Sequence, residues 1–330
     1  MAVRRERPFE PRGGTETPAN VFFTRRKLLF AAAGLAALGG GIAALRTASE
    51  WADDGQTAIA AGQLSAAKRW QRYYPAIRDA RFDYGRPQTD RGQAARYCNF
   101  YEFSSGKKVW RHVQQFEPDP WSLTITGLCR QPLTLNLDEF YREFSADIVE
   151  RQYRHRCVER WAMAVPWIAV PLAAVLKAVD PLAAATHVRF VSFEQPEVAP
   201  HQASGRDFPW PYTEGLTLAE AQNELPLLAI GVYGQPLLKQ HGAPLRLVVP
   251  WKYGYKSIKS VRLIELVDHE PATFWSTLNP TAYPFPSNVD PTDTTPWRQT
   301  TETMLGSGTQ YPTQPWNDYG KWLQRLYPSL

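Results

Sequence analysis

Alternating apolar and polar residues predict β-strands through the middle of the chain. WSLTITG (121–127) alternates and ends in Gly, and HVRFVSF (187–193) has the same character. Three further segments are rich in Val, Ile and Leu and are bounded by Gly or Pro, which also predicts strands: LLAIGVYG (227–234), PLRLVVPW (244–251) and SIKSVRLIELV (257–267). We therefore expect a β-rich core.

Helical spacing is confined to short segments. LDEFYREF (137–144) places its apolar residues three and four apart, and VPLAAVLKAV (170–179) is predicted to be an apolar helix. TLAEAQ (217–222) opens with Thr217, followed three residues later by Glu220, which is a capping box. The fold class that we expect is α+β, a β-rich mixed core with peripheral helices.

The two flanks of this core have less regular patterns. Residues 50–96 mix Ala, Gln, Arg and Asp with weak periodicity, which predicts an exposed or loosely packed segment. FWSTLNPTAYPFP (274–286) suits neither a helix nor a sheet interior. Because so many aromatic side chains would be poorly kept in water, we expect a long ordered C-terminal tail that wraps the domain. The predicted divisions are a signal peptide (1–48), an N-terminal lead-in (49–95) and a single domain (96–330).

Charge is concentrated at the start of the chain. The net charge is +5, and residues 1–48 hold eight Lys and Arg against three Glu, which leaves 29 basic and 29 acidic side chains in the rest. The body is therefore close to neutral, and the basic isoelectric point does not support nucleic-acid binding. A hydrophobic content of 44% is ample for a core and argues against disorder.

The N-terminal pattern is typical of a twin-arginine (Tat) signal. Arg25 and Arg26 precede residues 28–45, a stretch without charge that is rich in Ala and Gly. We expect cleavage between Ala44 and Trp51 and a periplasmic location, with an uncleaved membrane anchor as the alternative. Twin-arginine export carries folded proteins, so this signal favours a protein that receives a cofactor before export.

Cys157 lies in an unusual setting within YRHRCVERWAM (153–163). Its neighbours Arg154, His155, Arg156 and Arg160 would lower the pKa of the thiol and favour the thiolate. A buried inert thiol, a nucleophile and a soft-metal ligand are the alternatives. The other cysteines are Cys98 and Cys129, so one disulfide plus one thiol and three thiols are both possible. The chain contains no C-x-x-C spacing, so a zinc site is not favoured.

Two later segments have the residues of an anion site. KQHGAPLR (239–246) and WKYGYKSIKS (251–260) combine Lys, Arg and His with glycines, which suits a phosphate-bearing ligand. The Rossmann and P-loop fingerprints are absent. With a thiolate and a folded-export signal, these segments predict a phosphorylated, metal-bearing cofactor.

At these residues the chain resembles the sulfite-oxidase-fold molybdenum enzymes. The resemblance runs from Cys98 to the mid-270s through NFYEF (99–103), RCVERW (156–161), VPW (165–167), GVYG (231–234), HGAP-x-R (241–246) and VPWKYG-x-K-x-IKS (249–260). Within the family it is most similar to the periplasmic protein-methionine-sulfoxide reductase catalytic subunits. It therefore implies a sulfite oxidase-like molybdopterin-binding fold and one molybdenum–molybdopterin (Mo-MPT) cofactor per chain.

The resemblance also implies which residues hold that cofactor. Cys157 would ligate molybdenum, beside the two dithiolene sulfurs of the pterin. The other implied contacts are Asn99, Tyr101 and Glu102 in NFYEF, Ser192 at a position where the subgroup usually has Thr, and, at the phosphate end, His241, Arg246, Ser257, Ile258 and Lys259.

The chain departs from the subgroup at two positions. The subgroup generally reads Asn-Asn-Phe-Tyr-Glu, and here Cys98 stands at the first Asn, as either a substitute contact or a spectator. His241 stands where the subgroup often has Asn, and His there is found in the wider family.

The residues after Cys157 bear on the reaction. Val158-Glu159-Arg160-Trp161 favours the reductase subgroup, which implies oxygen-atom transfer from methionine sulfoxide in oxidised envelope proteins. Glu159 is predicted to be catalytic, as a proton donor or an outer-sphere anchor, or else to form a salt bridge with a nearby Arg. Electrons would come from a haem-containing integral membrane partner (MsrQ type), since no second redox motif is present. The alternatives are a sulfite oxidase, a reductase of small S- or N-oxides, and an exported binding protein that is not an enzyme.

Overall fold

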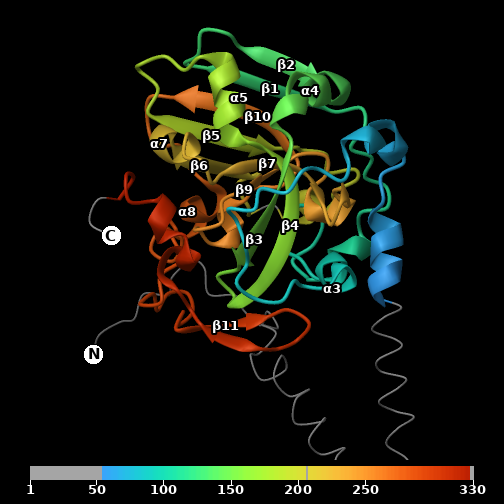
Figure 1. Cartoon of the computed structure of the whole chain (residues 1–330), viewed down its shortest axis with the longest axis vertical. Coiled ribbons are helices and arrows are strands. Elements are labelled where there is room, and N and C mark those ends of the chain that lie inside the picture. Colours follow the sequence, from blue (N-terminus) through green and yellow to red (C-terminus); the bar gives the residue numbers. More distant parts are fainter. Residues whose placement is uncertain (1–53, 206, 328–330) are drawn as a thin grey trace, which may run out of the picture. The chain divides into compact units, whose positions relative to one another are not determined.

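Two β-sheets form the framework of the computed structural model, which describes residues 54–205 and 207–327. The first sheet has the order β2-β1-β10-β5-β6, and the second has the order β12-β11-β4-β7-β8, with β3 paired to β4 and β9 to β7 (Figure 1). The strands are β1 Ser122–Gly127, β2 Leu133–Asn136, β3 Val149–Arg156, β4 Trp161–Pro171, β5 His187–Ser192, β6 Thr213–Thr217, β7 Leu227–Val232, β8 Gln235–Pro236, β9 Arg246–Val248, β10 Val261–Val267, β11 Thr301–Met304 and β12 Gln310–Pro312.

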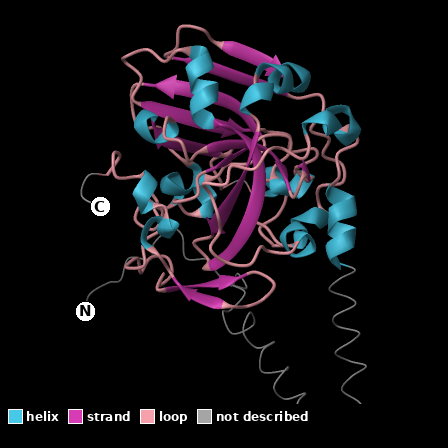
Figure 2. Ribbon diagram, viewed as in Figure 1, coloured by secondary structure: helices cyan, strands magenta, loops and turns pink. Residues whose placement is uncertain are grey.

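The helices are short and surround the sheets (Figure 2). Residues 54–62 are helical, and the α-helices that follow are α3 Arg91–Arg96, α4 Leu137–Glu143, α5 Leu172–Val179, α6 Pro200–Ser204, α7 Leu218–Ala221 and α8 Phe274–Leu278. The 3₁₀ turns are η1 Ala67–Tyr73, η2 Val109–Arg111, η3 Ser145–Asp147, η4 Lys239–His241, η5 Gly254–Lys256, η6 Pro315–Asp318 and η7 Gly320–Trp322. In the part of the chain that the structure describes, no helix has the length and apolar character needed to cross a bilayer.

Sequence patterns explain most of these elements. In β1 the buried Leu123 and Ile125 alternate with more exposed threonines, because one face of the strand meets the core. Every residue of β7 is buried, since the strand lies between β4 and β9. The capping box of Thr217 and Glu220 starts α7 as predicted.

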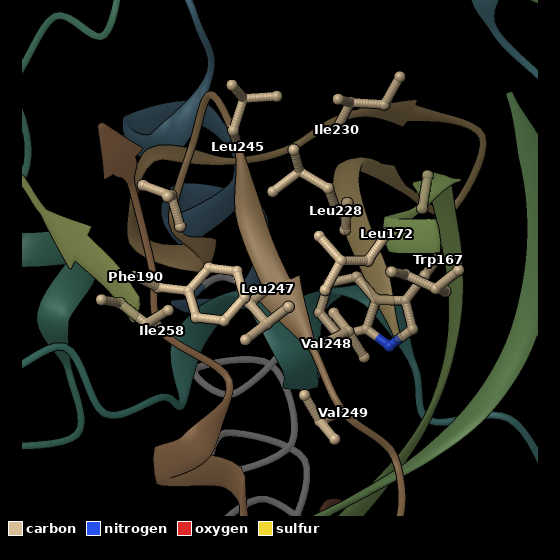
Figure 3. Packing of buried hydrophobic residues seen from close by; sticks show 14 of the residues in the cluster. Trp167, Leu172, Phe190, Leu228, Ile230, Leu245, Leu247, Val248, Val249 and Ile258 are labelled. Carbon is tan, nitrogen blue, oxygen red and sulfur yellow. The ribbon is translucent and has the colours of Figure 1, made fainter. Parts of the chain in front are cut away.

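The core joins the two sheets. Figure 3 shows Phe190 of β5 close to Leu247 of β9, with Leu228 of β7 and Trp167 of β4 in the same cluster. Apolar side chains from both sheets thus share one buried volume, and burial of this area is the main favourable term in folding. The shared core holds the loops after β3, β7 and β9 in fixed positions.

Residues 54–95 pack more tightly than their pattern predicts. Trp70, Tyr74 and Phe82 are buried in the main core, so the prediction of an exposed or loose segment is wrong for these residues. Trp70 stacks on Tyr141, and the Tyr74 hydroxyl donates to the carbonyl of Ile230. The segment is held by separate aromatic anchors rather than by one helical face, and such anchors leave no periodicity. The predicted end of the signal peptide at residue 48 lies outside the described residues.

Two other predictions need correction. FWSTLNPTAYPFP contains α8, a five-residue helix that begins at the N-cap Thr273 and is too short to show a period. The hairpin of β3 and β4 is absent from the predicted strands, because β4 is buried at every position except its last and so does not alternate. The ordered tail is confirmed: β11 pairs in parallel with β4, with Thr303 opposite Trp161.

Candidate active site

One pocket collects nearly all the predicted site residues. Its void, measured out to the open mouth, is about 1020 Å³. Three stretches of chain form most of its wall, 94–102, 155–167 and 241–259, and single residues from other segments complete it. The predicted residues in its wall are Asn99, Tyr101, Glu102, Cys157, Glu159, His241, Arg246, Ser257, Ile258 and Lys259.

Cys157 lies at the tip of the β3–β4 hairpin. Its N–H donates to the carbonyl of Trp161 and its own carbonyl accepts from Arg160, at 2.9 Å each, which closes a tight turn. Arg160 takes the left-handed conformation that this turn requires, with φ of 69°. The hairpin therefore projects the thiol into the pocket from a rigid base.

The predicted basic surroundings of the thiol are largely neutralised by carboxylate partners. Side chains alternate along β3, so Arg154 and Arg156 point away from the face that carries His155 and Cys157. Arg154 pairs with Asp318 at 2.6 Å, and buried Arg156 pairs with Glu302 at 3.1 Å.

Burial, followed by the charge of Glu159, raises the pKa of the Cys157 thiol to about 12. The prediction of a lowered pKa is therefore wrong, and the free thiol is not an activated nucleophile. A bound metal ion displaces the thiol proton outright, so a ligand role remains open to this cysteine.

Glu159 is held by a cluster of donors beside the thiol. Lys107 lies 2.6 Å from Glu159 Oε2, which also accepts from Trp161 Nε1 at 2.9 Å and from Asn99 Nδ2 at 3.2 Å. Burial raises the pKa of Glu159, but the charge and hydrogen bonds of Lys107, Trp161 and Asn99 outweigh it and leave the pKa below its usual value. The carboxyl is thus ionised at neutral pH and its partner is Lys107, not the predicted Arg.

The opposite part of the wall is basic. The Arg246 guanidinium donates to three backbone carbonyls, including those of His241 and Ser257, and the Lys259 ammonium donates to the carbonyl of Asn99 at 2.6 Å. Among the described residues, neither cation forms a salt bridge with a carboxylate. Burial lowers the pKa of Arg246 to about 10, and burial with Arg246 nearby lowers that of Lys259 to about 8. Two buried cations with no carboxylate of the described residues at salt-bridge distance favour an anion in the pocket.

His241 completes this basic end. Its Nε2 lies 3.1 Å from the carbonyl of Ala94, which can only accept, so Nε2 carries the proton. Its Nδ1 is buried and has no partner among the described residues. An unpaired polar atom in a pocket wall is costly unless a ligand satisfies it. Arg246 and Lys259 fit the terminal phosphate of a pterin cofactor, and His241 fits it in its protonated form, in which Nδ1 is also a donor.

The remaining predicted residues support the wall or lie behind it. Ser257 Oγ accepts from the Val249 N–H, and the Ile258 carbonyl accepts from Leu247, so both brace β9. Ser192 does not line the pocket: its Oγ donates to the carbonyl of Lys259 at 2.8 Å from behind. Burial raises the pKa of Glu102 to about 7.

Lys252 and Lys256, included in the predicted phosphate-binding segment, serve another purpose. Lys252 pairs with Glu220 at 2.6 Å and Lys256 pairs with Glu214 at 2.7 Å, and all four side chains are buried. These pairs fix the segment that carries Lys259, the one lysine of the three in the pocket wall.

The chain is similar to known proteins over most of its length. Residues 110–275 match the family described as oxidoreductase molybdopterin binding domain. The chain is 42% identical over 322 residues to the protein-methionine-sulfoxide reductase catalytic subunit MsrP of Gluconobacter oxydans, covering 95% of this chain and 94% of the relative. It is 39% identical to MsrP of Burkholderia mallei (95% and 92% covered) and 44% identical over 243 residues to MsrP of Xanthomonas campestris (71% and 74% covered).

The chain belongs to the MsrP family. Among solved structures, the sulfane dehydrogenase SoxCD of Paracoccus pantotrophus is similar with a TM-score of 0.40 and 15% identity, covering 63% of this chain and 47% of that one. The expected α+β fold and the molybdopterin-binding domain are confirmed. Membership of this domain family implies a molybdenum–pterin cofactor.

This member of the MsrP family also has pocket residues that its motifs do not reveal. The mouth is aromatic, with Tyr255, Trp275, Tyr283 and Trp297 in the wall beside Tyr101. Trp275 packs edge-on against Tyr101 at 4.9 Å and lies 5.0 Å from Tyr283. The Trp-rich composition of the tail was the available signal, but composition alone does not say which rings reach the pocket.

Cys98 is one of the pocket residues at which this MsrP family member differs from the subgroup pattern. Its thiol is buried and lies 3.3 Å from the carbonyl of Gln240, near Arg246 and Lys259. All three cysteines are free thiols, which decides between the alternatives left open by the sequence. Cys98 thus lies in the pocket wall.

Proposed function

We propose that this chain is the catalytic subunit of a periplasmic methionine sulfoxide reductase system. It reduces methionine sulfoxide in oxidised envelope proteins to methionine, with consumption of two electrons and two protons and release of water. The observation that carries the proposal is the 42% identity to an MsrP across 95% of the chain, together with a pocket that brings Cys157 and the basic end together.

We assign the Mo-MPT cofactor, one per chain, to this pocket. Cys157 supplies the thiolate ligand of molybdenum, and a soft metal suits a thiolate. His241, Arg246 and Lys259 bind the terminal phosphate, with Ser257 and Ile258 shaping that end. Asn99, Tyr101 and Glu102 complete the contacts, and Ser192 supports the wall from behind through the Lys259 carbonyl. When bound, the reduced molybdenum centre would supply the two electrons for the reduction and would accept the sulfoxide oxygen.

The mouth of the pocket supports a neutral sulfur substrate. Rings of Tyr101, Trp275, Tyr283 and Trp297 offer apolar faces on which a methionine side chain can pack through sulfur–aromatic contact. Beside the thiol, the Glu159 carboxylate is neutralised by Lys107 at 2.6 Å, so among the described residues this end of the pocket offers no free cation for an anion such as sulfite. Trp297 is 43% exposed at this rim, where a side chain of another protein can reach it.

We assign Glu159 the role of an outer-sphere anchor, which orients the groups around the thiol without donating a proton. Since it is ionised and its Oε2 already accepts from Lys107, Trp161 and Asn99, it has no proton to donate. Its oxygens hold the donors around the thiol in fixed orientations. Protons for the reaction then come from water at the open mouth.

Export and electron supply follow from the family and the N-terminal sequence. Arg25 and Arg26 before an uncharged stretch support folded export through the twin-arginine pathway to the periplasm. The relatives are named catalytic subunits, which implies a separate partner subunit. We assign the electron supply to a haem-containing integral membrane partner of the MsrQ type.

A two-substrate assay on the exported holoprotein tests this proposal. Molybdenum and pterin are measured first, and each is expected at one per chain. Reduction of methionine sulfoxide in an oxidised protein is then followed with a reduced viologen dye, and sulfite oxidation with ferricyanide. Turnover of sulfite without methionine sulfoxide reduction would overturn the proposal in favour of an oxidase. Absence of molybdenum would favour an exported binding protein.

A further inference from the structure

Lys107 joins three polar groups beside the Cys157 thiol. Its ammonium donates to both carboxylate oxygens of Glu159, at 2.7 and 2.6 Å, and to the Asn99 side-chain oxygen. Lys107 does not line the pocket itself. It acts on the thiol through its contacts with Glu159 and Asn99 and through its charge, which lowers the pKa of Cys157 against the larger effect of burial.

The contact to Asn99 determines how its amide is oriented. An ammonium group can only donate, so the amide atom that faces Lys107 must be the oxygen. The amide nitrogen is then turned toward the pocket, where it lies 3.6 Å from Cys157 Sγ and 3.2 Å from Glu159 Oε2. Without Lys107, turning the Asn99 amide to the opposite orientation would cost much less free energy, because no ammonium group would require the oxygen on that side.

The backbone keeps both partners in place. The Lys107 carbonyl accepts from the Cys98 N–H at 3.1 Å, next to Asn99 in the chain. The Asn99 carbonyl accepts from Lys259 at 2.6 Å. The Lys107 and Glu159 side chains are each 25% exposed, so the charge of the pair is only partly screened by water.

We propose that Lys107 is a positioning residue that directs the Asn99 amide N–H to the sulfur of Cys157 and thereby sets the redox potential of the metal that this sulfur binds. Hydrogen bonds to a ligating thiolate withdraw electron density from it and tune the potential of the metal. The inference rests on the proposed ligation by Cys157 and names a residue that acts on it from outside the pocket.

The test compares Lys107→Met with Lys108→Met in the exported holoprotein. Lys108 is the next residue, is 54% exposed and pairs with Asp54 at 3.0 Å, so its loss changes the net charge equally without touching Asn99. The readouts are the molybdenum content, the Mo(V) electron paramagnetic resonance spectrum and the midpoint potential from a redox titration. We expect Lys107→Met to shift the potential to more negative values and to change the spectrum, and Lys108→Met to do neither.

Further variants separate orientation from simple charge. Lys107→Arg keeps the cation and the donor, and we expect it to restore most of the wild-type potential. In an Asn99→Ala background, Lys107→Met should shift the potential by less than it does in the wild type. Equal shifts in both backgrounds, or a Lys107→Met protein with wild-type spectrum and potential, would overturn the inference. A wild-type protein without molybdenum would overturn the proposed function as well, so the two failures are distinguishable.

Discussion

Gly242 lies so close to Lys259 that a Cβ atom at position 242 would come within 2.6 Å of the Cβ and Cγ atoms of the lysine. Gly242 also has φ of +94°, where residues with a Cβ atom are strained. The contact joins the loop that carries His241 to the segment that carries Lys259. The basic end of the pocket therefore depends on the small size of a glycine next to Lys259.

The first prediction follows from that contact. Gly242→Ala should lower the free energy of unfolding by about 1–2 kcal/mol through the left-handed conformation alone. Displacement of Lys259 should lower it further and reduce the pterin content of the purified protein. Urea unfolding and pterin analysis measure both effects.

Gly308→Ala is the matched control for this variant. Gly308 has φ of +68°, but beyond its chain neighbours no atom lies within 4 Å of the place that a Cβ atom would take. This variant should show only the conformational cost and keep its pterin. Equal pterin loss in both variants would contradict the role assigned to the Gly242–Lys259 contact.

The second prediction concerns Cys157. Cys157→Ser removes the soft sulfur ligand while it keeps nearly the same volume in the hairpin turn, so molybdenum and activity should fall below detection. The melting temperature of the cofactor-free protein should change little. Cys129→Ser, at a half-buried thiol outside the pocket wall, should retain both metal and activity. Full activity of Cys157→Ser would exclude the ligand role.

The third prediction concerns the aromatic rim. Trp297→Ala should raise KM for protein-bound methionine sulfoxide roughly 2- to 10-fold, which corresponds to a sulfur–aromatic contact of about 0.3–1.5 kcal/mol. kcat should stay near the wild-type value, because the ring lies at the mouth. Ile77→Ala, at a side chain that is 86% exposed and outside the pocket wall, should leave KM unchanged. A rise in KM for Ile77→Ala of the same size would contradict a specific role of the rim.

The fourth prediction concerns the acid sensitivity of the cofactor-free protein. Burial lowers the pKa of His241 to about 4 in the folded state, against about 6.5 for an ordinary histidine. Because the pKa of His241 is lower in the folded state, the neutral buried ring makes its full contribution to stability above pH 6.5. This contribution is lost as the pH falls through 4. The full loss amounts to about 3 kcal/mol.

His241→Asn should remove this dependence. We expect the variant to lose less unfolding free energy than the wild type between pH 6.5 and 4, as measured by urea titrations at each pH. His112→Asn, at an exposed histidine, is the control and should follow the wild type. Parallel pH profiles of wild type and His241→Asn would show that another group is responsible.

The local sequence alone determined several features of this protein. Alternation in residues 122–127, the spacing in 137–143 and the Thr217–Glu220 capping box are encoded by near neighbours, and the structure has each of them. The motifs from 99 to 103, 156 to 161 and 241 to 260 also identified the family, and all but Ser192 of the predicted site residues line one pocket.

Only the tertiary structure decided the chemical environment of these residues. Arg154 and Arg156 stand beside Cys157 in the sequence, but they point away from it and pair with Asp318 and Glu302, so burial outweighs their effect on the pKa of the thiol. Lys107, about fifty residues away along the chain, becomes the partner of Glu159 instead. Electrostatic effects depend on distance and burial in space, and the packing of separate segments sets both of these quantities.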